Sequence, residues 1–205
     1  MVARIHPTAL VEDGVELGDG TSVWDNAHLR APTRIGRDCI IGGKTYVAYD
    51  VVIGDMVKLN AFVYVCAAVT IDDGVMVGAH SVFTNDRFPR ATDPEIETPR
   101  GSEPDEHTRP TAVRRGATLG ARVVVGSDLE IGPWAMVGMG SVVTRDVPAH
   151  HLVVGSPAHT IGYVCRCGEP FHRGDHADVD PTPCPACGRR YRVDQRRVQE
   201  QDVVS

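Results

Sequence analysis

The sequence predicts an all-β protein in which short parallel strands stack into a solenoid, and two observations lead to this fold class. A six-residue pattern runs without insertion from residue 5 to residue 88, which makes fourteen hexads. Glycine is frequent, with 21 residues, whereas aromatic residues make up only 5% of the chain. A fixed period and this composition favour a repetitive β architecture over a helix bundle.

The hexads have a regular internal pattern. The first position is large and apolar throughout, from Ile5 to Phe83, and the fifth is Ala, Val, Thr, Cys or Ser in thirteen hexads. Because these positions are two residues apart, they face the same side of a short strand. Glycine often holds the second position, next to a corner, where it allows close backbone approach or an unusual φ. A strand and a turn every six residues predict stacked coils around one continuous core.

The pattern stops once. Arg87 breaks the fifth position, and the segment 89–112 then contains five prolines, six acidic residues and three arginines before hexads resume over 113–148. A structureless segment of this length in a compact domain is usually functional or disordered, and a tolerated insertion is the simpler alternative. We expect a loop that protrudes from one corner of the solenoid.

The net charge and the hydropathy of the chain limit the kinds of partner that it could bind. The formal net charge is −6, which argues against nucleic acid as a partner. No apolar run reaches the roughly 18 residues needed to span a membrane, and residues 1–30 contain no secretory signal. We therefore expect a cytoplasmic protein without membrane contact, whose six cysteines are thiols or metal ligands.

The last part of the chain has a different composition and predicts a separate segment. Four of its cysteines form two knuckles, Cys165-x-Cys167-Gly and Cys184-x-x-Cys187-Gly, with the segment 168–183 between them. Four thiolates suit tetrahedral zinc and leave no open position, so we expect a structural site, with His172 and His176 as less favoured ligands. A segment of about 40 residues has too small a core to fold readily alone, and metal would supply stability. The predicted domains are a β-helix over 1–163 and a zinc-ribbon-like tail over 164–205.

The tandem [LIV]-G-x-x-[STAV]-x hexads resemble the hexapeptide-repeat acyltransferases. The resemblance implies a left-handed parallel β-helix with three hexads per coil, a homotrimer, and acetyl-CoA bound in the groove between two subunits. It also implies that the loop at 89–112 frames an active site between subunits. With three hexads per coil, His80 stacks above Phe62, Lys44 and Asn26, and Asn85 stacks above Ala67, Tyr49 and Ala31.

A closer resemblance covers residues 5–163. The segments HPTALVEDG, VWDNAH, VTIDDGVMVGAHSVFTN, VRRGATLGA and VVGSPAHTIG are similar to bacterial N-acetyltransferases of nucleotide-linked amino sugars. The pattern is nearest to enzymes that acetylate the 3-amino group of UDP-2-acetamido-3-amino-2,3-dideoxyglucuronate. The chain departs from it where Asp25 and Asn26 follow Trp24, since an aromatic pair is familiar there, and the loop is longer and more acidic. The resemblance therefore implies an acetyl-CoA-dependent N-acetyltransferase and leaves the sugar open.

Candidate catalytic residues lie just before the loop. Many related acyltransferases place a histidine base there, whereas this chain has Asn85 and Asp86. An amide is no base at neutral pH, but it can accept a hydrogen bond from an amine or donate one to an oxyanion. We expect Asn85 to orient a neutral amine. His80 is the rival base, although an exposed histidine is often only solvated, and Asp86 could hold a substrate ammonium or orient a histidine.

Binding residues are assigned mainly by the resemblance. The guanidinium forks of Arg114 and Arg115 suit CoA phosphate, although an exposed charged corner explains them equally well. The resemblance brings the pantetheine arm to Gly120, Ala121 and Gly138, and the adenine end to Ser156 and Pro157, followed by His159 where relatives have Lys or Arg. The candidate acceptor-binding residues are Trp24, Asn26, His28, Tyr49 and Arg90.

Two other functions are compatible with the sequence, and a third is excluded by it. An acyltransferase for another small hydroxyl or amine acceptor is one alternative, and a non-enzymatic β-helix for binding or assembly is another. A γ-class carbonic anhydrase binds zinc through three histidines, and its paired histidines are five residues apart late in the helix. This function is excluded, because no two of the nine histidines are five apart and residues 113–148 contain none. Cys39 occupies a fifth-position core slot, and Cys66, beside a corner, is expected to be structural rather than nucleophilic.

Overall fold

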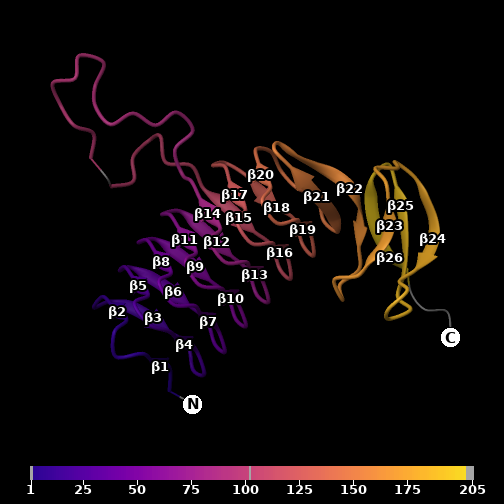
Figure 1. The fold of residues 1–205 in the computed structure, drawn as a ribbon, viewed down its shortest axis with the longest axis horizontal. Helices are drawn as coiled ribbons and strands as arrows, with labels where there is room; N and C mark the ends of the chain where they lie inside the picture. The colour runs from indigo at the N-terminus through magenta and orange to yellow at the C-terminus, as the bar shows by residue number, and fades with distance from the viewer. Residues whose placement is uncertain (1, 102, 202–205) are drawn as a thin grey trace.

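The protein is a parallel β-solenoid with an antiparallel β tail at its C-terminal end (Figure 1). The computed structural model describes residues 2–101 and 103–201, and every regular element in these ranges is a β-strand. No helix in this part of the chain is long and apolar enough to cross a membrane. Ser22 pairs with Ile40, the equivalent position three hexads further on, which confirms three hexads per coil.

Three parallel sheets, A, B and C, form the sides of the solenoid. Sheet A contains β1 (Arg4–Ile5), β4 (Ser22–Val23), β7 (Ile40–Ile41), β10 (Lys58–Leu59), β13 (Met76–Val77), β16 (Thr118–Leu119) and β19 (Met136–Val137), and continues through β21 (His151–Gly155), β22 (Ala158–Val164) and β23 (Pro170–Arg173). Sheet B contains β2 (Leu10–Val11), β5 (His28–Leu29), β8 (Tyr46–Val47), β11 (Tyr64–Val65), β14 (Val82–Phe83), β17 (Val124–Val125) and β20 (Val142–Val143). Sheet C contains β3 (Val15–Leu17), β6 (Thr33–Ile35), β9 (Val51–Ile53), β12 (Val69–Ile71), β15 (Thr111–Val113) and β18 (Glu130–Ile131). The turns between these strands form three columns, which we name the AB, BC and CA corners after the sheets they join.

The core follows the hexad pattern. The first-position residues from Val23 to Phe83 and from Val113 to Val143 are all buried. Fifth-position residues such as Thr33 and Val57 are also buried, as two positions on one strand face require. Each fully buried aliphatic side chain contributes about 1.5–3 kcal/mol relative to an exposed one.

Second-position glycine permits the coils to stack closely. A Cβ on Gly18 would lie 2.5 Å from the carbonyl carbon of Gly36 in the next coil. Real Cβ atoms essentially never approach backbone so closely. Glycine is needed at Gly18 for this close approach and not for an unusual φ, because the φ of Gly18 is not in the left-handed region.

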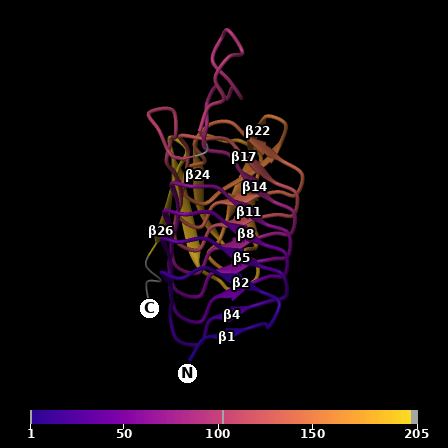
Figure 2. The same cartoon turned by 90° about the vertical axis from the view of Figure 1, so that its left-hand side faces the viewer.

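The loop leaves the solenoid at the BC corner, and both figures show it standing away from the stacked coils (Figures 1 and 2). Val69 pairs with Thr111, whereas the regular three-hexad period would pair it with Arg87. The pairing partner of Val69 is thus displaced from residue 87 to residue 111, and this displacement equals the length of the insertion. Its length matches that of the expected segment 89–112, but its position is shifted. The backbone N–H of Arg109 donates to the Asn85 carbonyl at 2.8 Å, which closes the neck of the loop.

The shift has a packing cause. Phe88, expected to end the first run of hexads, is 79% exposed and belongs to the loop. Thr111 is buried in a fifth-position slot of β15, so the solenoid resumes before Val113. The expected span 89–112 therefore becomes an insertion after Asn85 that ends before β15.

The tail continues sheet A and then forms its own sheet. β22 and β23 are antiparallel to their neighbours, and β24 (Val179–Pro183), β25 (Arg190–Asp194) and β26 (Arg197–Gln201) make a three-stranded antiparallel sheet. The tail has a second hydrophobic core, separate from that of the solenoid, and its aromatic residues are Tyr163, Phe171 and Tyr191. The expected boundary between residues 163 and 164 falls within the last two residues of β22.

Two buried histidines join the last coil to the tail. The His150 Nδ1 atom lies 2.9 Å from the Val164 carbonyl, and His151 Nε2 lies 2.9 Å from the Arg196 carbonyl. Burial lowers the pKa of both imidazoles, so both are neutral at pH 7. The tail thus covers the end of sheet A, where an open solenoid would expose unpaired backbone groups.

Candidate active site and metal centre

The neck of the loop presents a free amide. Asn85 is half-buried at the BC corner, and its side chain makes no hydrogen bond to any residue in the described ranges 2–101 and 103–201. Asp86 follows it and forms an isolated bridge with Thr108 across the neck. The expected register is confirmed, since the strand pairing places Asn85 above Ala67. The amide is therefore available for a ligand.

The nearest thiol is chemically inert. Cys66, at the same corner one coil below, is 3% exposed. Burial, with a smaller contribution from the charge of Asp86, raises the pKa of its thiol to about 12. A thiolate is the reactive form of cysteine. Cys66 is thus no nucleophile at neutral pH, as the sequence indicated.

His80 lies at the AB corner, at the other end of β14 from Asn85. Its ring is exposed and stacks on Phe62 with the ring centroids 4.6 Å apart. The Lys44 ammonium lies 5.5 Å from the Phe62 ring and 2.9 Å from an Asp25 carboxylate oxygen. This confirms the predicted column of His80, Phe62 and Lys44.

The same corner continues past the loop with a residue that the sequence analysis missed. Arg122 occupies the coil above His80, because its backbone N–H donates to the Ala79 carbonyl and the strands that follow the two residues pair Val82 with Val124. Both Arg122 and His80 have φ of 60°. The Arg122 side chain has no ion pair among the described residues. Counting the period across the loop would have revealed this position.

The candidate cofactor residues fall at two different corners. Gly120, Ala121 and Gly138 lie at the AB corner, on the same side as His80. A Cβ on Gly138 would lie 2.5 Å from Val154 of β21, which places Gly138 beside the β21–β22 hairpin. That hairpin carries the exposed Ser156, Pro157 and His159.

The two candidate phosphate-binding arginines lie instead at the CA corner. β16 separates Arg114 and Arg115 from Gly120. Arg114 is held by Glu130, with Nη2 and Nε at 2.6 and 2.8 Å from one carboxylate oxygen, and this pairing raises its pKa. Arg115 is exposed. The structure does not bring this pair together with the glycines.

The candidate acceptor residues are distributed over the solenoid. His28 lies on the outer face of sheet B, with Nε2 3.0 Å from Glu12 Oε1, and its ring meets that of Tyr46 edge-on. Tyr49 lies at the BC corner next to Arg30 of the coil below, whose guanidinium carbon is 5.0 Å from the ring. The others are elsewhere: Trp24 and Asn26 at the AB corner, and Arg90 in the loop. One chain alone does not gather these side chains into a pocket.

The tail brings its four cysteines together. Their Sγ atoms all lie within 4.8 Å of one another, with Cys165–Cys187 at 3.4 Å and Cys167–Cys184 at 3.6 Å. A tetrahedron with Zn–S bonds of about 2.3 Å has sulfur–sulfur edges of about 3.8 Å. Gly168 and Gly188 follow the two knuckles with φ of 91° and 76°. This cluster fits a metal ion of zinc's size and coordination.

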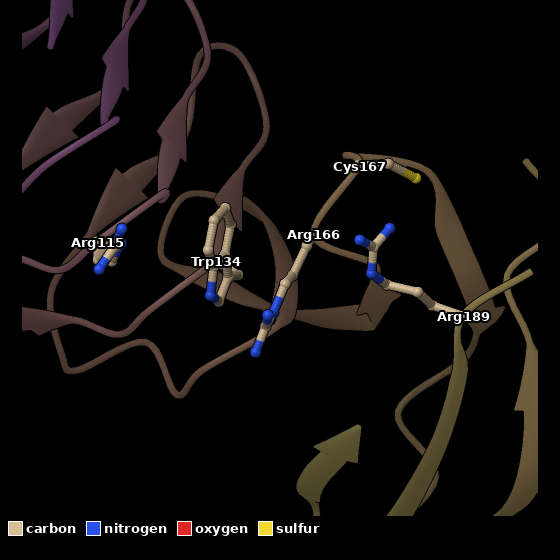
Figure 3. Close-up of a pocket in the computed structure, with 5 residues that line it drawn as sticks. All are labelled: Arg115, Trp134, Arg166, Cys167 and Arg189. Carbon is tan, nitrogen blue, oxygen red and sulfur yellow. The ribbon is translucent and has the colours of Figure 1, made fainter. Parts of the chain in front are cut away.

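A cleft of about 590 Å³ lies between the CA corner and the cysteine knuckles. It is lined by Arg115, Trp134, Arg166, Cys167 and Arg189 (Figure 3). Two of these residues come from the solenoid and three from the tail.

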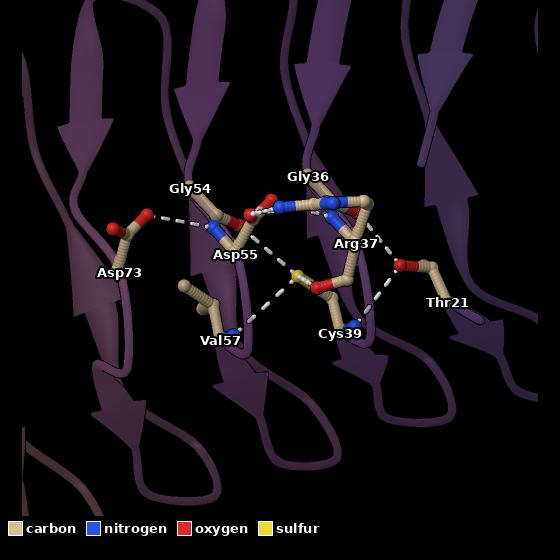
Figure 4. A network of polar contacts seen from close by, with 8 residues as sticks. All are labelled: Thr21, Gly36, Arg37, Cys39, Gly54, Asp55, Val57 and Asp73. Atoms are coloured by element: carbon tan, nitrogen blue, oxygen red, sulfur yellow. Dashed lines mark hydrogen bonds and ion pairs between the residues drawn. The ribbon is translucent and has the colours of Figure 1, made fainter. Parts of the chain in front are cut away.

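The CA corner of the earlier coils is closed by its own polar contacts (Figure 4). The Thr21 hydroxyl donates to the Gly36 carbonyl at 2.7 Å and accepts from the Cys39 N–H at 3.0 Å. The Cys39 Sγ lies 3.1 Å from the Gly54 carbonyl, and burial raises the pKa of this thiol. Cys39 is therefore a core residue, as expected, and its polar contacts are satisfied within the corner.

The fold and its repeats define a class: this chain is a hexapeptide-repeat β-solenoid. The repeat described as bacterial transferase hexapeptide matches residues 14–49 and 50–85, and the hexapeptide repeat of succinyl-transferase matches residues 32–67.

Two curated relatives are similar in sequence. The dTDP-3-amino-3,6-dideoxy-α-D-galactopyranose 3-N-acetyltransferase of Aneurinibacillus thermoaerophilus is 45% identical over 82 residues, 40% of this chain and 40% of the relative. Serine acetyltransferase 4 of Arabidopsis thaliana is 30% identical over 160 residues, 78% of this chain and 29% of the relative. The alignments thus cover less than half the length of either relative.

Two solved structures share the fold. One is a variant of GDP-perosamine N-acetyltransferase from Caulobacter crescentus in complex with CoA and GDP-perosamine, with a TM-score of 0.54, 23% identity, and coverage of 79% of this chain and 57% of that chain. The other is a variant of an N-acyltransferase from Bacillus cereus in complex with dTDP and coenzyme A, with a TM-score of 0.50, 17% identity, and coverage of 80% and 82%.

Proposed function

We propose that this chain is an acetyl-CoA-dependent N-acetyltransferase that acts on the amino group of a nucleotide-linked amino sugar. The observation that carries the proposal is the uncommitted amide of Asn85 at the loop neck, beside a thiol too buried to ionise. The 45% identity to a 3-N-acetyltransferase of a nucleotide-linked amino sugar supports the same reaction class.

The transfer is direct. The neutral amine attacks the thioester carbonyl carbon, the carbon–sulfur bond breaks, and the amine proton and the CoA thiolate end as free CoA thiol. Asn85 Oδ1 accepts a hydrogen bond from the attacking amine and so fixes its direction. An acyl-enzyme on Cys66 is disfavoured because its pKa of about 12 leaves almost no thiolate. Asp86 holds the substrate near the same neck.

Acetyl-CoA occupies the AB corner of one subunit and presents its thioester to Asn85 at the loop neck of the next. Gly120, Ala121 and Gly138 expose backbone to the pantetheine arm, and the Ser156–Pro157 turn with His159 receives the adenine end. Arg122 supports this placement, because it adds a guanidinium without a carboxylate partner among the described residues. Arg122, rather than Arg114, then binds a CoA phosphate, because the charge of Arg114 is already neutralised by Glu130. Arg115 lines the cleft between the CA corner and the cysteine knuckles instead.

The active enzyme is a homotrimer with the acceptor site between subunits. The outer face of sheet B supports this: Tyr46 and Tyr64 stack 5.2 Å apart there, and Leu10, Tyr64 and Val124 are exposed. An exposed apolar stripe of this kind marks a contact surface. A trimer would also bring Trp24, His28 and Tyr49 of one subunit toward the loop of the next subunit, which carries Arg90. A cytoplasmic location is part of this proposal, because cysteine ligands need a compartment that keeps thiols reduced.

The tail holds a structural zinc ion. Cys165, Cys167, Cys184 and Cys187 supply four sulfur ligands, and the spacing of these atoms supports one tetrahedral ion. Zinc would complete the small second core and keep the tail docked on sheet A.

The deciding experiment is release of free thiol from acetyl-CoA with a panel of nucleotide-linked 3-amino and 4-amino sugars. Release with at least one 3-amino sugar, with the acetyl group found on nitrogen by mass spectrometry, is the expected result. If no sugar in the panel increases thiol release over the acceptor-free rate, the proposed function is wrong.

A hydroxyl acceptor is the second candidate, favoured by the 30% identity to a plant serine acetyltransferase. Attack by a hydroxyl benefits from a base, and His80 would supply it. Loss of turnover in His80→Gln with retention in Asn85→Ala would favour this alternative.

A further inference from the structure

The cleft between solenoid and tail is a basic site that the proposed acetyl transfer does not use. Arg115, Arg166 and Arg189 bring three guanidinium groups to one cavity of about 590 Å³, within the size range of small-molecule sites. The cleft lies at the CA corner, whereas the proposed CoA residues lie at the AB corner, across sheet A.

Two of the arginines are held in place by one carboxylate. Glu200 forms an ion pair with each: its Oε2 lies 2.9 Å from Arg166 Nε, and its Oε1 lies 3.3 Å from Arg189 Nε. The terminal nitrogens of Arg166 make no hydrogen bond within the described ranges 2–101 and 103–201, so their donors stay available for a ligand. The Arg189 Nη1 atom contacts Cys187 Sγ at 3.6 Å, which leaves Nη2. Glu200 thus acts as a positioning residue for a two-arginine fork.

Trp134 provides an aromatic wall. Its ring rests against Gly116, where an added Cβ would lie 2.2 Å from two ring carbons. Glycine at this position therefore makes room for the indole. The Arg166 guanidinium lies 5.5 Å from the ring centroid, and Figure 3 shows Trp134 between Arg115 and Arg166. Trp134 has φ of 58°, a conformation that a bulky residue adopts rarely and at some expense in free energy.

We propose that this cleft binds a nucleotide, with its phosphates on Arg115, Arg166 and Arg189 and its base against Trp134. Guanidinium forks match phosphate oxygens bidentately, and the part of the half-buried indole that Gly116 and Arg166 leave uncovered offers a contact surface to a base. Glu200 offsets part of the positive charge, and Arg189 also contacts a sulfur of the metal centre, so Arg115 and Arg166 supply most of the attraction for an anion. The site joins residues of solenoid and tail, so a bound nucleotide would stabilise their packing.

A purely structural role for the arginines predicts different behaviour. Arg166 would then only attach the tail to Trp134, and Arg189 would only neutralise thiolates of the metal centre. In that case substitutions would change thermal stability or zinc retention and leave nucleotide binding unaffected.

Fluorescence of Trp134 provides the test. The chain has two tryptophans, so in a full-length Trp24→Phe background the signal comes from Trp134 alone. We titrate ADP, with orthophosphate and adenosine as separate probes. ADP is expected to give a saturable change with a Kd at least about tenfold below that of either fragment, since each supplies only part of the contact.

Variants locate the site. Arg166→Gln and Arg189→Gln are each expected to raise the Kd for ADP about tenfold or more. Arg192→Gln, an exposed arginine on β25, and Arg122→Gln, at the proposed CoA groove, are the matched controls and should leave it unchanged.

Three results would overturn the nucleotide site. They are no saturable change with ADP at millimolar concentration, equal Kd values for ADP and orthophosphate, or identical Kd values in Arg166→Gln, Arg189→Gln and the controls. None of these results bears on thiol release from acetyl-CoA, so this site and the proposed function are tested separately.

Discussion

Replacing Asn85 with alanine removes an amide that the fold does not use. The side chain makes no hydrogen bond within the described ranges, and the carbonyl that closes the loop neck is backbone and remains. Asn85→Ala should therefore fold normally, with a melting temperature close to that of the unchanged protein. The whole effect should fall on the reaction.

The size of that effect follows from one hydrogen bond to the reacting amine. A hydrogen bond that involves a charged or charge-developing group contributes about 1.5–3 kcal/mol, which corresponds to roughly a tenfold to hundredfold loss in kcat/KM. Because the bond strengthens as the amine becomes positive during attack, most of the loss should appear in kcat.

The assay is initial-rate thiol release over pH 6 to 9 with saturating acetyl-CoA. Without a side-chain base, the rate should rise with deprotonation of the substrate amine, and Asn85→Ala should keep the shape of this profile at lower height. Asn60→Ala, a half-buried asparagine at the AB corner, is the matched control. Unchanged kcat/KM in Asn85→Ala would refute the assigned role, and an ionisation in the pH–rate profile that disappears in His80→Gln would point to a histidine base.

Three further predictions concern binding and stability. Arg122→Gln should raise the KM for acetyl-CoA about tenfold, whereas Arg114→Gln should change it little; the reverse order in steady-state kinetics would place CoA at the CA corner. Purified protein should contain one zinc ion per chain by elemental analysis, and Cys184→Ser should lose it together with the near-ultraviolet circular dichroism of the tail; retention of both would exclude a structural site. The pKa of His150 is lowered by burial, so its contribution to stability is present above its unfolded pKa of about 6.5 and is lost as pH falls through the folded value. Melting temperatures from pH 7.5 to 5.5, with zinc content monitored, should therefore fall, and should fall less in His150→Gln; an equal slope would assign the pH dependence elsewhere.

Much of the fold could be predicted because a six-residue period is a local property. The first and fifth positions alternate with outward ones on every strand, so the core from Val23 to Val143 follows from the sequence alone. The column of His80, Phe62 and Lys44 also follows, once three hexads per coil are assumed. Two cysteine knuckles predicted the metal cluster for the same reason, since each knuckle is a short local motif.

The loop boundary could not be placed as well. Proline and charge marked the segment, but Thr111 is compatible with either a loop or a fifth-position strand residue. Only its pairing with Val69 assigns it to β15. The same pairing fixes the length of the insertion and thereby places Arg122 above His80.

The sequence by itself determined the solenoid, the existence of the loop, the amide at its neck and the four-cysteine cluster, because each depends on neighbours in the chain. Tertiary structure alone decided which charges are free. Arg114 and Arg115 are adjacent in sequence, yet Arg114 is neutralised by Glu130 while Arg115 faces a cleft with Arg166 and Arg189. Ion pairs and cavities depend on side chains from coils and sheets that are distant in sequence, so no period or motif specifies them.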